Sequence, residues 1–119
     1  MLTILSVEDN EGIVVGRETY YDGSKEVKLL SAKSLDEARA LIQAHPEIML
    51  ALLDGEVDGG GVLPNTEVLI PLLLELGEIK IIACASHPDS NASLMSRGAH
   101  DTWKKEEIFT KIQALMFEQ

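Results

Sequence analysis

Short apolar segments alternate along the chain with segments whose apolar residues recur at helical spacing. The apolar segments are rich in Val, Ile and Leu, and they cover Leu2–Val7, Val27–Ser31, Ile48–Leu53, Ile79–Cys84 and, more weakly, His100–Trp103. Segments that are apolar at almost every position are typical of strands buried on both faces, as in a parallel sheet. The pattern therefore predicts five strands of one parallel sheet.

Helices are predicted between these strands. In the clearest case Ser34 and Glu37 form a capping-box pattern, and the helix should end before Pro46, because the residue before a proline disfavours helical geometry. The apolar stripe of this helix consists of Leu35, Ala38, Leu41 and Ile42. The last predicted helix has a similar stripe of Ile108, Ile112, Leu115 and Met116. Pro71 requires the third helix to start late, near Ile70, or to be kinked.

The regular alternation of strands and helices predicts a (βα)5 chain of the α/β class, in which right-handed crossovers place helices on both faces of the sheet. A short fourth helix is expected at roughly Ser90–Arg97, before Gly98. We therefore expect a doubly wound, flavodoxin-like fold with a parallel five-stranded sheet of order 2-1-3-4-5. The 119 residues show neither an internal repeat nor a linker, so we expect a single domain over residues 1–119.

Charge and composition exclude several classes of function. Lys and Arg number 10 against 20 Asp and Glu, a net charge of −10, which argues against non-specific nucleic-acid binding and against docking on anionic membranes. The single cysteine, Cys84, can form neither an internal disulfide nor a Cys-rich zinc site. The N-terminus has no basic region and reaches Glu8 and Asp9 early, so it does not resemble a signal peptide. We expect a soluble, cytoplasmic protein.

Charged residues follow three of the predicted strands. Glu8-Asp9-Asn10 follow the first, Asp54 the third and Lys104-Lys105 the fifth. Each alone has an ordinary explanation, as a helix cap, a turn residue or a solvated lysine. In a 2-1-3-4-5 sheet, however, the first and third strands are neighbours, so the three carboxylates should converge. Such a cluster needs a compensating cation, Mg²⁺ prefers all-oxygen ligands, and a lysine over the same pocket suits a phosphoryl group.

Three stretches carry a family resemblance. Ile4-Leu5-Ser6-Val7-Glu8-Asp9-Asn10, Leu52-Leu53-Asp54 and Gly98-Ala99-His100-Asp101-Thr102-Trp103-Lys104-Lys105 resemble the signature regions of response-regulator receiver domains. The resemblance covers essentially the whole chain. It implies that a histidine kinase or phosphotransfer protein donates a phosphoryl group to Asp54. It also implies that Mg²⁺ or Mn²⁺ is held by Asp9, Asp54 and the backbone carbonyl of Glu56, with Glu8 acting largely through water, and that Lys105 pairs with the phosphoryl oxygens.

The resemblance also implies how such a domain signals. No DNA-binding or enzymatic output is recognisable, so we expect the domain, whether stand-alone or part of a longer protein, to act on a downstream protein through its helix 4–strand 5–helix 5 surface, here roughly Ser90–Phe117. It would be a monomer or a phosphorylation-dependent dimer. Its only chemistry would be the transfer of the phosphoryl group to its own aspartate and the later loss of that group.

The chain departs from the family pattern at the switch residues. Where the family has Thr or Ser followed by Ala, this chain has Ala85-Ser86, so either Ser86 takes the role by a one-residue shift or the hydroxyl is missing. The switch aromatic aligns with Thr102, and Trp103 lies one place off, where we expect it to be a packed strand residue. Glu106 replaces the usual proline. The usual Met-Pro is replaced by Val57-Asp58-Gly59-Gly60-Gly61, which we interpret as a flexible loop rather than a phosphate cradle.

Two other functions remain open from the sequence. The first is a degenerate receiver that binds partners without phosphorylation, favoured by the missing Thr-Ala order and opposed by the intact acidic and lysine set. The second, a remote alternative, is a Toprim-like metal-dependent phosphoryl-transfer enzyme using Glu8, Asp54 and Asp58, which the charge of −10 disfavours. The dispersed His45, His87 and His100 are assigned no catalytic role.

Overall fold

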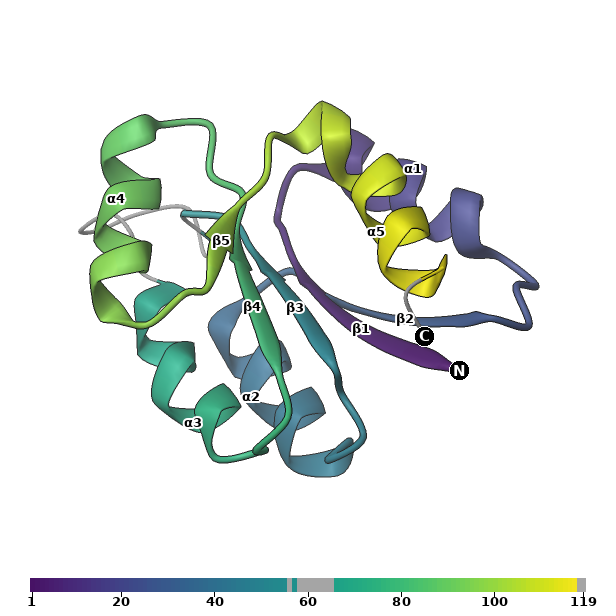
Figure 1. Cartoon of the computed structure of the whole chain (residues 1–119), viewed down its shortest axis with the longest axis horizontal. Coiled ribbons are helices and arrows are strands. Elements are labelled where there is room, and N and C mark those ends of the chain that lie inside the picture. The colour runs from purple at the N-terminus through teal and green to yellow at the C-terminus, as the bar shows by residue number, and fades with distance from the viewer. Residues whose placement is uncertain (56, 58–65, 118–119) are drawn as a thin grey trace.

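The structure is a computed structural model that describes residues 1–55, 57 and 66–117. Its centre is a five-stranded parallel sheet of order β2-β1-β3-β4-β5, as Figure 1 shows. The strands are β1 (Leu2–Val7), β2 (Val27–Ala32), β3 (Leu50–Leu53), β4 (Lys80–Ala83) and β5 (Asp101–Thr102). The predicted α/β class and strand order are confirmed.

Helices cover both faces of the sheet. They are α1 (Glu11–Tyr21), α2 (Leu35–Ala44), α3 (Ile70–Leu74), α4 (Pro88–Arg97) and α5 (Ile108–Phe117), with short 3-10 turns η1 (Thr66–Leu69) and η2 (Lys105–Glu107). Figure 1 shows α1 and α5 on one side of the sheet and α2, α3 and α4 on the other. No helix in the described part of the chain is long and apolar enough to cross a membrane.

The core consists of two layers, because successive strand residues point to opposite faces. Leu5 of β1, Ala51 of β3 and Ile81 of β4 lie in register and pack against α2, α3 and α4. Their neighbours Ile4 and Leu50, which are also in register, pack in the layer that contains residues of α1 and α5. The central strands are thus buried on both faces, as the apolar runs predicted.

Several strands are shorter or less buried than predicted. β2 is intermediate in burial at its four central positions, since its edge position leaves it only partly covered. β5 has two residues instead of the predicted His100–Trp103. β3 starts at Leu50 rather than Ile48, and β4 covers only Lys80–Ala83.

The helix starts follow local chemistry. Ser34 caps α2 by accepting a hydrogen bond from the backbone N–H of Glu37 at 3.1 Å, as predicted. Helix α3 begins at Ile70 with Pro71 in its first turn, where a missing N–H costs nothing. Helix α4 begins at Pro88 rather than Ser90 for the same reason, so this predicted start was wrong by two residues.

Candidate metal-binding site

The register of β1 and β3 brings two acidic residues together at the carboxyl edge of the sheet. Val7 pairs with Leu53, and the next residues along the two strands are Glu8 and Asp54. The backbone N–H of Asp54 donates to the carbonyl of Val7 at 3.0 Å, which extends the ladder by one residue. Asn10 accepts a hydrogen bond from the N–H of Ile13 at 3.1 Å and thereby caps α1 immediately after the acidic pair.

Glu8, Asp9 and Asp54 form an acidic cluster. Each offers one carboxylate oxygen, and these oxygens all lie within 4.8 Å of one another. Glu8 is buried, Asp54 partly buried and Asp9 exposed. Oxygen donors at this spacing, open to solvent on one side, fit a hard divalent cation such as Mg²⁺ or Ca²⁺. The cluster resembles the metal site of receiver domains, so three of the predicted ligands are brought together.

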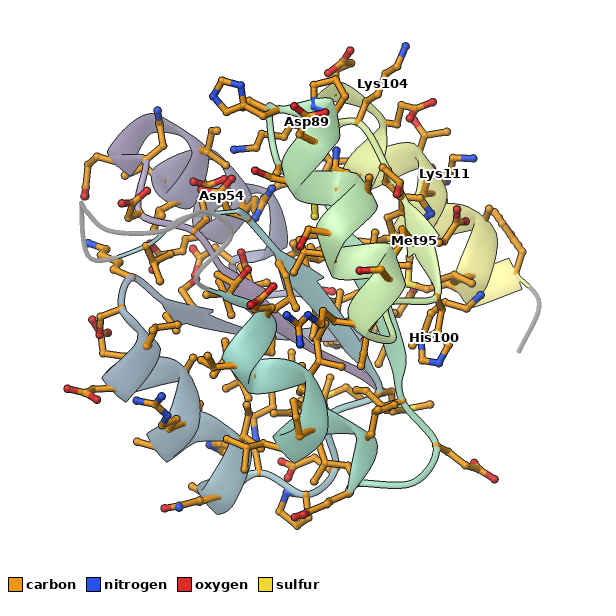
Figure 2. The ribbon with its side chains drawn as sticks, turned by 90° about the vertical axis from the view of Figure 1, so that its left-hand side faces the viewer. Asp54, Asp89, Met95, His100, Lys104 and Lys111 are labelled. Atoms are coloured by element: carbon orange, nitrogen blue, oxygen red, sulfur yellow. The ribbon has the colours of Figure 1, made fainter. Side chains whose placement is uncertain are left out.

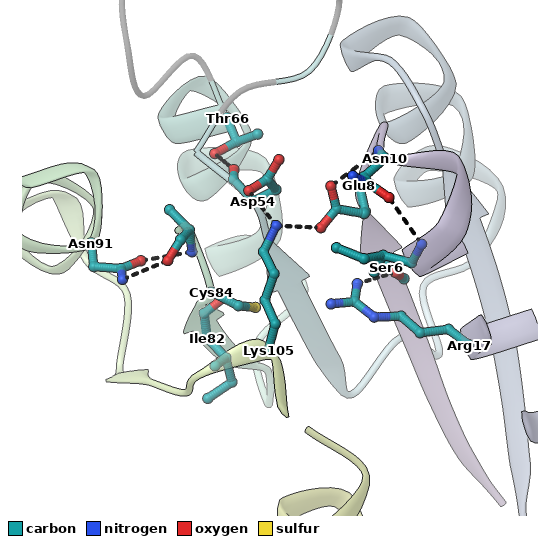
Figure 3. Close-up of polar contacts among 12 residues, drawn as sticks. Ser6, Glu8, Asn10, Arg17, Asp54, Thr66, Ile82, Cys84, Asn91 and Lys105 are labelled. Carbon is teal, nitrogen blue, oxygen red and sulfur yellow. Dashed lines mark hydrogen bonds and ion pairs between the residues drawn. The ribbon is translucent and has the colours of Figure 1, made fainter. Parts of the chain in front are cut away.

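Lys105 lies between the two strand ends. Its Nζ is 2.7 Å from Oε1 of Glu8 and 3.1 Å from Oδ1 of Asp54, as Figure 3 shows. The lysine side chain is 20 % exposed, Asp54 14 % and Glu8 only 1 %. The predicted lysine therefore reaches the same pocket as the acidic cluster, and one ammonium group partly neutralises two crowded carboxylates.

The surroundings shift the protonation of both partners. Burial raises the pKa of Asp54 above its ordinary value, the nearby charge of Glu8 raises it further, and the hydrogen bond from Lys105 offsets only part of this. Burial alone would lower the pKa of Lys105, but its hydrogen bonds to Glu8 and Asp54 outweigh that effect and raise it. A further cation in the pocket would favour the ionised carboxylates.

Backbone and hydroxyl groups hold the carboxylate-bearing segments in place. The backbone N–H of Asn10 donates to Oε2 of Glu8 at 3.2 Å, so both carboxylate oxygens of Glu8 are engaged. The buried hydroxyl of Thr66, the first residue of η1, donates to the backbone carbonyl of Asp54. Sequence reasoning missed Thr66, because it follows a glycine-rich stretch with no pattern that relates it to β3.

A buried arginine lies beneath the acidic cluster. Nη1 of Arg17 donates to the hydroxyl of Ser6 at 2.7 Å, and Arg17 is 4 % exposed (Figure 3). The residue was not singled out from the sequence, although it shares the buried stripe of α1 with Val14 and Tyr21 at helical spacing. Cys84, also buried nearby, has its pKa raised to about 12 by burial, so the thiol stays protonated.

A cavity of about 290 Å³ opens above the acidic cluster. It is lined by Glu8, Asp9, Asn10, Asp54, Gly55, Ala85, Ser86, His87, Ser90 and Lys105. Ser86 lines this cavity but is exposed, whereas Ser90 is buried. Ala85 is held by Asn91, whose side chain accepts from the N–H of Ala85 at 2.8 Å and donates to its carbonyl at 3.0 Å.

The two candidates for a switch residue differ in their surroundings. Trp103 is 4 % exposed and packs in the core layer with Ile82 and Ile108. Its indole N–H donates to Oδ2 of Asp101 at 3.3 Å. Thr102 is exposed at the end of β5. Trp103 is therefore a packed residue, as expected.

Some predicted residues lie outside the described part of the chain or away from the site. The backbone carbonyl of Glu56, the glycine run Gly59–Gly61 and Asp58 are outside the described residues. His87 lines the cavity, while the imidazole Nδ1 of His100 accepts from the N–H of Ile81. Figure 2 shows Asp54 at the same end of the molecule as Asp89 and Lys104, with His100 toward the other end.

The fold and site define a class: a doubly wound α/β domain with an acidic pocket and a lysine at the carboxyl edge of its sheet. More specifically, this is the fold of CheY-like response regulator receiver domains. A receiver domain protein from Methanospirillum hungatei JF-1 has a TM-score of 0.74 and 19 % identity, over 99 % of this chain and 95 % of that one. A two-component response regulator from Clostridium difficile has a TM-score of 0.76 and 15 % identity, over 100 % and 98 % of the two chains.

A third similar structure is the BeF3-activated receiver domain of Klebsiella pneumoniae RstA, with a TM-score of 0.72 and 20 % identity over 98 % and 99 % of the two chains. No family model and no curated protein matches the sequence. The likeness is therefore one of fold, and it extends over nearly the whole chain.

Proposed function

We propose that this chain is a response regulator receiver domain whose Asp54 accepts a phosphoryl group from a histidine kinase or a phosphotransfer protein. The observation that carries the proposal is the double contact of Lys105, which reaches both Asp54 and Glu8 in the pocket where three carboxylates converge. The arrangement suits a site that binds a cation and a phosphoryl group side by side.

The transfer step needs little chemistry from the protein beyond positioning and charge. The P–N bond of the donor phosphohistidine breaks, and its electron pair remains on the imidazole ring. A P–O bond forms to a carboxylate oxygen of Asp54, giving an acyl phosphate. The transition state is loose, with charge spread over the three outer oxygens, so a positioned ammonium group stabilises it. We infer that Lys105 moves its contact from Asp54 to a phosphoryl oxygen. The only reaction is then at the protein's own aspartate.

A divalent cation would supply charge neutralisation for the phosphoryl oxygens. Asp9 and Asp54 are the ligands that the geometry favours, because Glu8 is already committed to Lys105 and to the N–H of Asn10. Mg²⁺ is the ion we propose, with Mn²⁺ as a substitute. A similar structure, a response regulator protein from Burkholderia pseudomallei, contains a phosphorylated aspartic acid and a calcium ion.

We propose that the output surface is formed by α4, β5 and the start of α5. A cavity of about 660 Å³ lies there, lined by Ala85, Ser86, Pro88, Asn91, Ala92, Met95, Thr102, Trp103, Lys104, Lys105 and Glu106. Figure 2 shows α4 with Asp89 and Met95 on the side facing the viewer. Because Lys105 lines both this cavity and the acidic pocket, a change at Asp54 can reach the surface through one residue.

A second candidate function is a receiver that binds its partner without phosphorylation. It is favoured by Ala85, which has no hydroxyl, and by the burial of Trp103, which leaves no aromatic free to rotate at that position. Both readings share the fold and the output surface. They differ in whether Asp54 is ever modified.

The deciding experiment is the intact mass of the chain after incubation with acetyl phosphate, with and without Mg²⁺. We expect one phosphoryl group on the wild-type chain only when Mg²⁺ is present, and none on Asp54→Asn. If neither acetyl phosphate nor a panel of histidine kinases modifies the wild-type chain, the binding-only receiver replaces this proposal. Nuclease activity with Mg²⁺ would instead favour the Toprim-like alternative.

A further inference from the structure

The acidic pocket has no hydroxyl at the end of β4. Cys84 donates its N–H to the carbonyl of Leu53, so it lies beside the end of β3, and the next residue is Ala85. Ser86 follows but is exposed. The side chain of Asn91 bonds both the N–H and the carbonyl of Ala85, which holds the backbone of this residue in place. Among the residues that line the cavity, the hydroxyl groups are those of Ser86, which is exposed, and Ser90, which is buried.

Ser90 offers such a hydroxyl from the first turn of α4. It is 6 % exposed and lines the same cavity as Asp54 and Lys105. Among the described residues, none forms a hydrogen bond with its side chain. The hydroxyl of this largely buried serine is therefore free to donate to a group that occupies the cavity. A free hydroxyl and the ammonium group of Lys105 line the same cavity, and both can donate hydrogen bonds to an anion bound there.

Gly55 explains how α4 comes so close to the site. A methyl group added at Gly55 would lie 3.1 Å from Cβ of Ser90, 3.2 Å from its Oγ and 3.0 Å from Cβ of Ala85. Any larger residue at position 55 would require Ala85 and Ser90 to move away by a few tenths of an ångström. The residue directly after Asp54 thus lets the hydroxyl of Ser90 sit against the end of β3.

We propose that Ser90 binds the phosphoryl group on Asp54, donating its hydroxyl proton to a phosphoryl oxygen in place of the hydroxyl missing at Ala85. The assignment rests on the proposed function, since it concerns the same phosphoryl group. It places a phosphate-binding residue on a helix rather than on a loop. The phosphoryl group would then contact α4, part of the output surface, directly.

The test is the rate of phosphorylation by acetyl phosphate with Mg²⁺, followed by intact mass, for Ser90→Ala and the matched control Ser86→Ala. Both serines line the cavity, so the pair separates the two hydroxyls. We expect Ser90→Ala to slow phosphorylation about tenfold, the usual effect of losing one hydrogen bond to charge. Ser86→Ala should stay within about twofold of wild type. Circular dichroism and urea unfolding show that each variant is folded.

A second readout does not depend on turnover. Beryllium fluoride with Mg²⁺ mimics a bound phosphoryl group, and the single tryptophan, Trp103, reports binding by fluorescence. Ser90→Ala should weaken this binding about tenfold and leave Mg²⁺ binding alone unchanged. Slower phosphorylation of Ser86→Ala with normal Ser90→Ala would overturn the assignment, as would normal rates and binding for both. If the wild-type chain accepts no phosphoryl group at all, the proposed function itself is wrong, and the role of Ser90 falls with it.

Discussion

The ammonium group of Lys105 lies 2.7 Å from the buried carboxylate of Glu8, although 97 positions separate the two residues in the chain. The same group lies 3.1 Å from Asp54, so one cation serves two carboxylates on neighbouring strands. A buried carboxylate without a partner is costly, and Glu8 is 1 % exposed. Lys105 is thus needed for stability as well as for the proposed chemistry.

Replacing this lysine should destabilise the fold. Lys105→Met leaves Glu8 and Asp54 facing each other, and we expect a loss of about 3 kcal/mol in the free energy of unfolding, the lower end for a buried pair because Lys105 is 20 % exposed. The exposed neighbour provides the control, Lys104→Met, which should change stability by less than about 0.5 kcal/mol. Urea unfolding measures both. Equal losses in the two variants would mean that the double contact does not stabilise the fold.

Mg²⁺ should stabilise the native chain through the acidic cluster. A ligand that binds only the folded state at ten times its Kd adds about 1.4 kcal/mol to the free energy of unfolding. Asp9→Asn should remove this increment while leaving the fold intact, since Asp9 is exposed. Asp36→Asn, an exposed acid on α2, is the matched control and should keep the increment. Thermal unfolding with and without Mg²⁺ measures it, and an increment that survives in Asp9→Asn would place the ion elsewhere.

Glycine positions in the fold should respond oppositely to alanine. Gly55→Ala forces a methyl group against Ala85 and Ser90, and we expect a loss of about 1–3 kcal/mol from overpacking. Gly16 lies in the interior of α1 with nothing within 4 Å of an added Cβ, so Gly16→Ala should stabilise by about 0.5–1 kcal/mol. Urea unfolding compares the two. Stabilisation by Gly55→Ala would show that α4 can move away from β3.

The thiol of Cys84 should be unreactive toward alkylating reagents in the folded chain. Alkylation requires the thiolate and access to it, whereas Cys84 is 1 % exposed and burial raises its pKa to about 12. We expect iodoacetamide at pH 8 to react at least about a hundredfold more slowly with the native chain than with the chain in urea. Mass spectrometry over time measures the two rates. Similar rates would mean that the β4 end opens readily.

Apolar patterning was sufficient to predict the sheet, because strands buried on both faces need apolar residues at every position. It was less informative at the edges. β5 is two residues long, although the N–H groups of His100 and Trp103 on either side of it also donate to carbonyls of β4. The start of α4 was misjudged because Pro88 was not considered as a first-turn residue.

For the site, strand topology predicted that Glu8, Asp9 and Asp54 meet, and the resemblance to receiver domains selected Lys105 over Lys104; these four residues do meet. Residues whose contribution depends on packing were missed. Ser90 is an ordinary polar residue in the sequence, and only the close approach of α4 over Gly55 brings it to the pocket. Such residues can be identified only from the three-dimensional structure, because no sequence periodicity reports the distance between a helix and the end of a strand.

The sequence distance between Glu8 and Lys105 also affects how the chain folds. The acidic groups at the ends of β1 and β3 come together as soon as those strands pair, but their counter-charge arrives only when the last segment docks, 97 residues after Glu8. That segment follows β5, which pairs with β4 and not with β1, so the counter-charge depends on completion of the sheet. In any partly folded state in which β1 and β3 are paired and β5 is not, these carboxylates face each other without Lys105. The charges that would hold a cation in the native protein therefore disfavour such partly folded states and make the folding of the sheet more cooperative.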